Sequence, residues 1–100
     1  MPRPILATID ICAMRSNLSL AKQRAGSASV WAVVKANGYG HGLDNALRGF
    51  QAADGLALVE PDAAVRLREL GWQQPVLLLE GYFDRQDLET VSEHALDTVV

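Results

Sequence analysis

The sequence predicts an α/β protein built on a parallel sheet, because apolar runs of strand length alternate with helical patterns along the chain. The apolar runs cover residues 30–34, 55–59, 75–79 and 97–100, and a helical pattern separates each run from the next. Repeating units of this kind predict right-handed crossovers. Both an open doubly wound sheet and a (β/α)8 barrel satisfy this order.

A closed barrel needs about 250 residues, whereas this chain has 100 and its last apolar run stops in mid-strand. We therefore interpret the chain as the N-terminal part of a longer enzyme, which in the barrel case is the N-terminal half of a (β/α)8 TIM-type barrel. Residues 1–29 are expected to form a strand and a helix that lead into the barrel, and residues 30–100 its first half, with the chain ending inside the fourth barrel strand.

The segment before the barrel begins with a short apolar stretch, Leu6–Asp10, which predicts a strand. Asp10 is a suitable N-cap for the following helix, because its carboxylate can accept from free N–H groups of the first turn. Gly26 stands where a left-handed residue ends a helix. The predicted inward face has apolar residues at i, i+4, i+7 and i+11: Met14, Leu18, Ala21 and Ala25.

The first barrel strand, Val30–Val34, is rich in β-branched and aromatic residues, which predicts burial on both faces. It ends in one cation, Lys35, at the strand's carboxyl end, where catalytic side chains of parallel α/β folds project. Apolar surroundings disfavour the charged form of a lysine, and this suits a base or a Schiff-base nucleophile. A lysine that leaves the strand and extends into water is the other interpretation.

The later helices carry the same kinds of signal. The pattern after the glycines predicts a helix with Leu43, Ala46, Leu47 and Phe50 inward, and Pro61 begins another with Ala63, Leu67 and Leu70 inward. Asp62 and Arg66 are spaced to form an ion pair, and Gly71 ends this helix. Asp84 is the expected cap of a last helix, whose apolar residues are Leu88, Val91 and Ala95.

Composition excludes several classes of protein. The net charge is −3, the pI is near 5.2 and no basic stripe stands out, so nucleic acid is not expected as a partner. No apolar run approaches the roughly 20 residues that cross a bilayer, and the N-terminus lacks the pattern of a signal peptide. The single cysteine, Cys12, fits a reducing compartment and is expected to pack as a small apolar residue. We expect a cytoplasmic protein.

The glycines that follow Lys35 are Gly38, Gly40 and Gly42, and they fit no phosphate-loop pattern. They favour a tight strand-to-helix turn and the close approach of a flat ring. No metal site is expected, because His41 has no second ligand at a suitable spacing and His94 is expected on an exposed helix surface. His41 is expected to fix the loop through a hydrogen bond, and a direct role in catalysis is the alternative. Glu80, after the third strand, has no assignable partner.

The contiguous string V-V-K-A-N-G-Y-G-H-G, residues 33–42, resembles the cofactor-lysine signature of the bacterial alanine racemases, which are pyridoxal-phosphate enzymes of fold-type III. The opening strand and helix are also similar to this family. The resemblance implies that Lys35 carries pyridoxal 5'-phosphate as an internal aldimine and that Tyr39 points its hydroxyl at the cofactor phosphate. Leu79 matches a family position that touches the cofactor, and Val33 is the other candidate for the ring pocket.

The resemblance further implies an isomerase that interconverts L-alanine and D-alanine, a peptidoglycan precursor. The amine of Lys35 would move the α-proton on one face, that of D-alanine. A tyrosine of the partner subunit in a homodimer would act on the other face. That tyrosine would come from a C-terminal β domain downstream of this chain, and two arginines that bind the pyridine nitrogen and the substrate carboxylate also lie outside it.

Two alternatives stay open at this stage. One is another fold-type III enzyme, such as a different amino-acid racemase or a D-amino-acid aldolase, because a pocket distinguishes one methylene by only about 1–3 kcal/mol. The other is a non-catalytic pyridoxal-phosphate carrier made of a single barrel.

Overall fold

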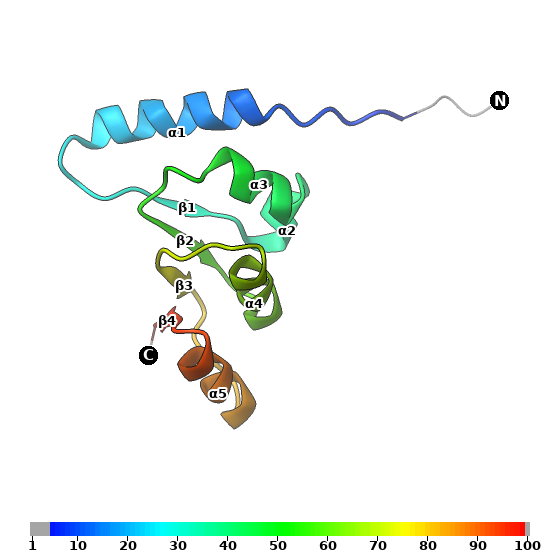
Figure 1. Cartoon of the computed structure of the whole chain (residues 1–100), viewed down its shortest axis with the longest axis vertical. Helices are drawn as coiled ribbons and strands as arrows, with labels where there is room; N and C mark the ends of the chain where they lie inside the picture. Colours follow the sequence, from blue (N-terminus) through cyan, green and yellow to red (C-terminus); the bar gives the residue numbers. More distant parts are fainter. Residues whose placement is uncertain (1–4, 100) are drawn as a thin grey trace.

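The computed structural model describes residues 5–99 of the chain. Strands and helices alternate through this range, which confirms the predicted α/β class (Figure 1). The elements in chain order are α1 (Ile11–Ala25), β1 (Trp31–Val33), α2 (Lys35–Tyr39), α3 (Leu43–Gly49), β2 (Gly55–Leu58), α4 (Pro61–Glu69), β3 (Val76–Leu78), α5 (Arg85–Glu93) and β4 (Asp97–Thr98). Within residues 5–99, no helix is both long and apolar enough to cross a membrane.

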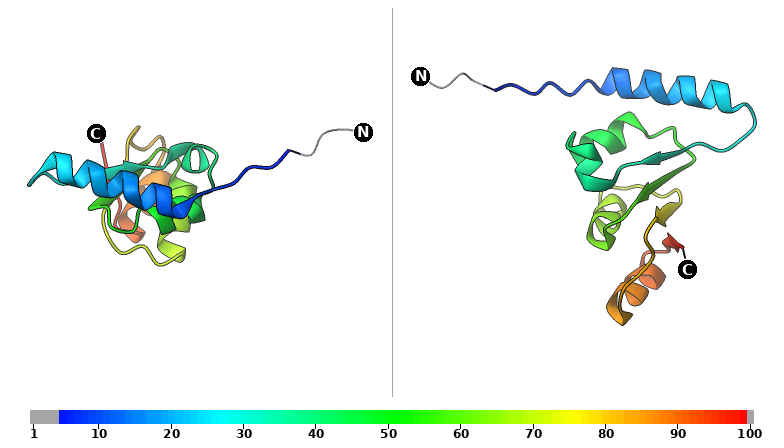
Figure 2. Two further views of the ribbon diagram at one scale, coloured as in Figure 1. Left: turned by 90° about the horizontal axis from the view of Figure 1, so that it is seen from above. Right: turned by 180° about the vertical axis from the view of Figure 1, so that it is seen from behind.

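The four strands form one parallel sheet, as predicted, and they lie in the order β1-β2-β3-β4. One sheet face packs on α3 and α4, and Leu56, Leu58, Val76 and Leu78 are completely buried there. Full burial of each such side chain stabilises the fold by roughly 1.5–3 kcal/mol. Views from the front and from behind place α3, α4 and α5 on the same side of the strands (Figures 1 and 2).

The opposite face of the sheet is more open at β1. Val33, Ala57 and Leu77 are aligned across the first three strands, so they point to this face together. The side chain of Val33 is 39% exposed, and β1 has no neighbouring strand on its outer edge. The expectation that this first strand is buried on both faces is therefore wrong for the described residues, because a strand at the edge of an open sheet is only partly covered.

Helix α1 confirms the predicted caps. The Asp10 carboxylate accepts a hydrogen bond from the Ala13 N–H at 3.0 Å, and Gly26 ends the helix with φ of +65°. Leu18 is buried, but Ala21 is exposed, so the apolar face is narrower than predicted. The helix crosses the edge of the sheet beside β1 and contacts α3 (Figure 2).

The segment before α1 does not form the predicted strand. Residues 5–10 have no strand pairing, and Ile5 and Leu6 are 98% and 87% exposed. From the N-terminal end of α1, the segment extends away from the other described residues (Figure 1). A strand requires a partner for its backbone hydrogen bonds, and residues 11–99 do not provide one here.

Three residues that were predicted on the apolar faces of the last two helices are exposed instead. Leu70 and Leu88 are 36% and 46% exposed, and Ala95 is exposed in the turn after α5. In α4, Ala64 is completely buried, whereas Ala63 is only partly buried. The predicted pair of Asp62 and Arg66 does not form, because Arg66 lies 3.7 Å from Glu69 instead. Asp84 caps α5 as predicted, through a 2.8 Å hydrogen bond from the Asp87 N–H.

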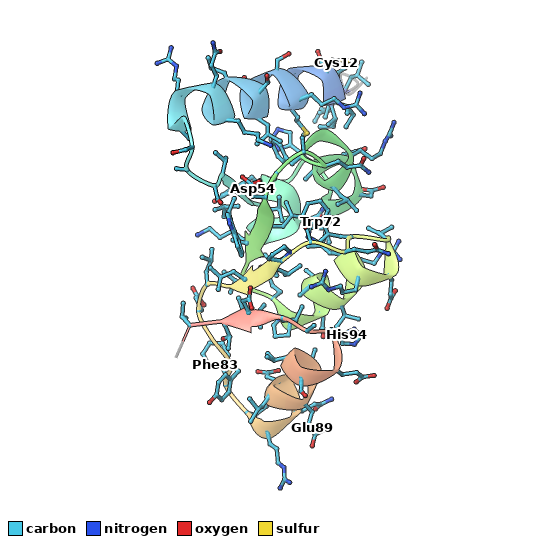
Figure 3. All side chains as sticks on the ribbon, turned by 60° about the vertical axis from the view of Figure 1, so that its left-hand side comes forward. Cys12, Asp54, Trp72, Phe83, Glu89 and His94 are labelled. Atoms are coloured by element: carbon cyan, nitrogen blue, oxygen red, sulfur yellow. The ribbon has the colours of Figure 1, made fainter. Side chains whose placement is uncertain are left out.

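Arg68 joins the two loops at the amino ends of β3 and β4. Its guanidinium donates to the carbonyl oxygens of Trp72 at 2.8 Å and Gln74 at 2.7 Å, both before β3. It also donates to those of His94 at 3.0 Å and Ala95 at 3.1 Å, after α5. Figure 3 labels Trp72 and His94 on these two loops. One planar, multivalent donor therefore fixes four backbone carbonyls from separate parts of the chain.

Candidate active site

Lys35 lies at the carboxyl end of β1, where the sequence predicted it. It directly follows Val34, which is 2% exposed, and it is itself half-buried. The carboxyl ends of parallel strands meet at one edge, so Lys35 shares this edge with Glu60 after β2 and with Leu79 after β3. Within residues 5–99, no carboxylate oxygen lies within 4.0 Å of the Lys35 amine.

The chain after Lys35 makes a left-handed turn. Ala36, Asn37, Gly38 and Tyr39 all have φ between +53° and +65°. A left-handed conformation costs roughly 1–2 kcal/mol for each residue with a side chain. Such strained backbone gathers at functional sites, where the surrounding structure holds it. The sequence analysis attributed the tight turn after Lys35 to its glycines alone. This was incomplete, because three residues with side chains share the left-handed conformation of Gly38.

Hydrogen bonds hold this turn from both ends. The Gly38 N–H donates to the Val34 carbonyl at 2.9 Å, and the Gly40 N–H donates to that of Ala36 at 3.0 Å. The side-chain oxygen of Asn37 accepts from the Leu43 N–H at 2.9 Å, at the start of α3. The turn thereby connects the lysine-bearing end of β1 to a helix that packs in the core.

His41 reinforces the same turn. Its Nδ1 lies 3.0 Å from the Gly38 carbonyl oxygen, and its own carbonyl accepts from the Asn45 amide at 3.0 Å. This geometry agrees with a residue that fixes the loop. Within residues 5–99, no group of three His, Cys, Asp or Glu side chains could hold a metal ion. His94 is half-buried at the end of α5 rather than on an exposed surface, and its backbone carbonyl accepts a hydrogen bond from Arg68.

The structure brings Val33 and Tyr39 to a common pocket of about 220 Å³ between α1, β1 and α2. The Tyr39 side chain is 57% exposed, so its phenol is accessible to a ligand. Lys35 and Leu79 do not line this pocket, although both lie at the carboxyl edge of the sheet. Leu79 is half-buried, and its N–H continues the sheet by donating to the Leu58 carbonyl at 2.8 Å.

Comparison with known proteins identifies the family of the chain. The family model for the N-terminal domain of alanine racemase matches residues 9–100. The chain belongs to this family. It is 65% identical over its whole length to an alanine racemase of Janthinobacterium sp. (strain Marseille) and covers 28% of that protein.

Solved structures of alanine racemases share the fold. The biosynthetic alanine racemase of Pseudomonas aeruginosa matches 99% of this chain with a TM-score of 0.92 and 38% identity, over 28% of its own length. The alanine racemase of Bacillus anthracis with bound L-Ala-P matches 92% with a TM-score of 0.82 and 29% identity, over 24% of its length. The described strands therefore correspond to the N-terminal part of a TIM barrel. The chain spans about 28% of the length of these relatives.

Two residues of this alanine racemase N-terminal domain were missed by sequence reasoning. Asn37 holds the turn, and Glu60 accepts from the Ala36 N–H through Oε1 at a long 3.4 Å. Glu60 directly follows the strand run 55–59, and strand ends converge in a parallel sheet. Its position at a strand end could therefore have identified Glu60 from the sequence. Asn37 could have been identified because asparagine tolerates left-handed backbone conformations.

Substitution of Asn37 by alanine is expected to loosen the turn. Alanine tolerates φ of +56° less well and cannot accept from the Leu43 N–H. We expect the free energy of unfolding to fall by about 1–2 kcal/mol, measured by urea denaturation of the full-length protein. Asn45→Ala is the matched control, since it removes only an exposed bond to the His41 carbonyl. An equal loss in both variants would contradict this role for Asn37.

Proposed function

We propose that the full-length protein is an alanine racemase that interconverts L-alanine and D-alanine with pyridoxal 5'-phosphate. The observation that carries the proposal is Lys35, a primary amine at the carboxyl end of β1 that is followed by a hydrogen-bonded left-handed turn. Membership of the alanine racemase family supports the same activity. The relative from Bacillus anthracis with bound L-Ala-P supports an alanine-sized substrate.

The residues at this edge fit pyridoxal phosphate. Lys35 offers a primary amine for a Schiff base, and Tyr39 offers an accessible phenol that can donate to a phosphate oxygen. A Cβ on Gly40 would meet no atom within 4 Å, so the backbone leaves open space beside Tyr39. We propose Lys35 and Tyr39 as cofactor-binding residues, with Val33 and Leu79 as apolar contacts for the ring.

The cofactor supplies an electron sink for the carbanion that forms when the α-carbon loses its proton. In this proposal the Lys35 amine takes or returns that proton on one face of the substrate. One amine cannot reach both faces, so the opposite face requires a second acid or base. We propose a tyrosine of the partner subunit in a homodimer for this step. The left-handed turn would keep Lys35 in the orientation that the transfer requires.

We further propose the division of the protein that the sequence predicted. Residues 1–29 would precede the barrel, residues 30–100 would form its first half, and a C-terminal β domain would follow elsewhere in the protein. We propose cytoplasmic placement. Cys12 does not pack as a small apolar residue, as the sequence suggested, because it lies on the exposed side of α1. Its free thiol supports this placement, since such thiols persist in reducing compartments.

The activity is tested with the full-length protein in deuterium oxide. L-alanine should be converted to D-alanine and should acquire α-deuterium, and both should depend on added pyridoxal phosphate. Chiral chromatography and mass spectrometry measure the two products. Deuterium incorporation without racemisation, or racemisation without the cofactor, would contradict the proposal.

The same assay separates the alternatives. A different racemase of the same fold type would turn over serine or another amino acid faster than alanine, and an aldolase would cleave a β-hydroxy amino acid. A carrier would bind the cofactor and leave both enantiomers of alanine unchanged. Alanine is expected to give the largest kcat/KM of the amino acids tested.

A further inference from the structure

A pocket between α1 and the end of α3 lies away from Lys35. It has a volume of about 620 Å³, within the range of small-molecule sites. Its lining combines apolar atoms of Leu18, Gly49 and Ala52 with three cationic side chains, Arg15, Lys22 and Arg48. No acidic residue lines it.

The three cations come together because of helix periodicity. Arg15 and Lys22 are seven residues apart on α1, so they share a face with the buried Leu18. Arg48 reaches the same pocket from the last turn of α3. The Lys22 amine donates to the Ala52 carbonyl at 2.7 Å, which joins α1 to the segment after α3 and leaves two of its three donors available.

These charges have no counterions within residues 5–99. The ion pairs described there are Arg66 with Glu69 and Arg85 with Glu89, both far along the chain. The nearest acids in the sequence are Asp10, Asp44 and Asp54. Asp10 caps α1, Asp54 accepts from the Val30 N–H, and none of the three has a carboxylate oxygen within 4.0 Å of a cation of the pocket. Three like charges around one partly apolar pocket repel one another, and a bound anion would relieve that repulsion.

The pocket is separate from the candidate active site. Its lining includes neither Lys35 nor Leu79, and it shares no residue with the pocket that Val33 and Tyr39 line. A ligand bound here would therefore not occupy the position of alanine beside Lys35.

We propose that this pocket binds an organic anion with a compact apolar body, its phosphate or carboxylate group held by Arg15, Lys22 and Arg48. The apolar part would lie on Leu18 and Ala52. Arginine suits this role because its planar fork donates two parallel hydrogen bonds to a phosphate or carboxylate.

The test uses the full-length protein saturated with pyridoxal phosphate and measures binding by calorimetry. The probes are 1-naphthyl phosphate, 1-naphthoate and the neutral 1-naphthylmethanol. The test variant is R15Q/R48Q. The matched control is R24Q/R85Q, which removes two exposed charges outside the pocket, one of them on the same α1. Circular dichroism checks that both variants fold.

At least one anionic probe should bind to the parent and to R24Q/R85Q, and its Kd should rise about tenfold or more in R15Q/R48Q. A preference for the naphthyl phosphate would identify a phosphate ester as the ligand, and a preference for the naphthoate a carboxylic acid. Equal affinity in all three proteins, or equally tight binding of 1-naphthylmethanol, would overturn the proposal. Because the readout is binding, it is independent of whether Lys35 supports racemisation.

Discussion

Replacement of Lys35 by alanine is expected to lower kcat/KM for racemisation by at least about 10³-fold in both directions. The variant lacks the amine that would hold the cofactor and move the α-proton. Lys35→Arg should be as inactive, because a guanidinium keeps the positive charge but neither forms a Schiff base nor gives up a proton at neutral pH. Lys22→Arg, in the other lysine of this chain, is the control and should keep its activity.

Exchange of the α-hydrogen separates the two roles of Lys35. With pyridoxal phosphate in excess, the alanine variant should exchange the α-hydrogen of D-alanine with deuterium oxide much more slowly than that of L-alanine. The proposed tyrosine on the opposite face is still present for L-alanine. Mass spectrometry of each enantiomer measures the rates. Equal exchange rates for the two enantiomers would refute the role of Lys35 as a base and leave its role as cofactor anchor intact.

Replacement of Arg68 by methionine is expected to destabilise the folded protein by about 3 kcal/mol or more. Its guanidinium donates to four backbone carbonyls at 2.7–3.1 Å, and methionine fills similar volume without any donor. The hydrogen bonds to Trp72 and His94 are partly buried, and each of these carbonyls costs about 1–3 kcal/mol when it loses its donor. The other two bonds are exposed, and water can replace the guanidinium there. Urea denaturation of the full-length protein measures the loss.

Arg66→Met is the matched control for Arg68→Met. Arg66 is on the same helix, but it pairs with Glu69 at 3.7 Å and both side chains are 59% exposed. An exposed pair of this kind contributes about 0–1 kcal/mol. If Arg66→Met destabilised the protein as much as Arg68→Met, the effect would belong to α4 as a whole and not to the four carbonyls.

Helix caps and apolar patterns made much of the fold predictable. Asp10, Asp84 and Pro61 each begin a helix where local chemistry said they would, since a cap depends only on nearby backbone groups. Residues 6–10 were predicted as a strand and are unpaired. Pairing depends on a partner elsewhere in the structure, and composition alone does not reveal whether one is present.

The place of the candidate site in the fold was predictable in part for the same reason. A lone cation at the end of an apolar strand is a local signal, and Lys35 does follow the carboxyl end of β1. Tyr39 was predicted as a site residue because it belongs to the contiguous string, and the cofactor roles of both residues stay predictions. Arg68 was not found, since its partners His94 and Ala95 are 26 and 27 residues away in the chain. The left-handed conformation of Ala36 also had no signal, because alanine rarely adopts it.

Lys35 is proposed to carry pyridoxal phosphate in the full-length protein. Borohydride reduction of the cofactor-loaded enzyme, followed by proteolysis and mass spectrometry of the peptides, tests this assignment. The result that we predict is a pyridoxyl group on the peptide that contains Lys35. A pyridoxyl group on Lys22, or an unmodified Lys35 peptide from an enzyme that retains its cofactor, would contradict the claim.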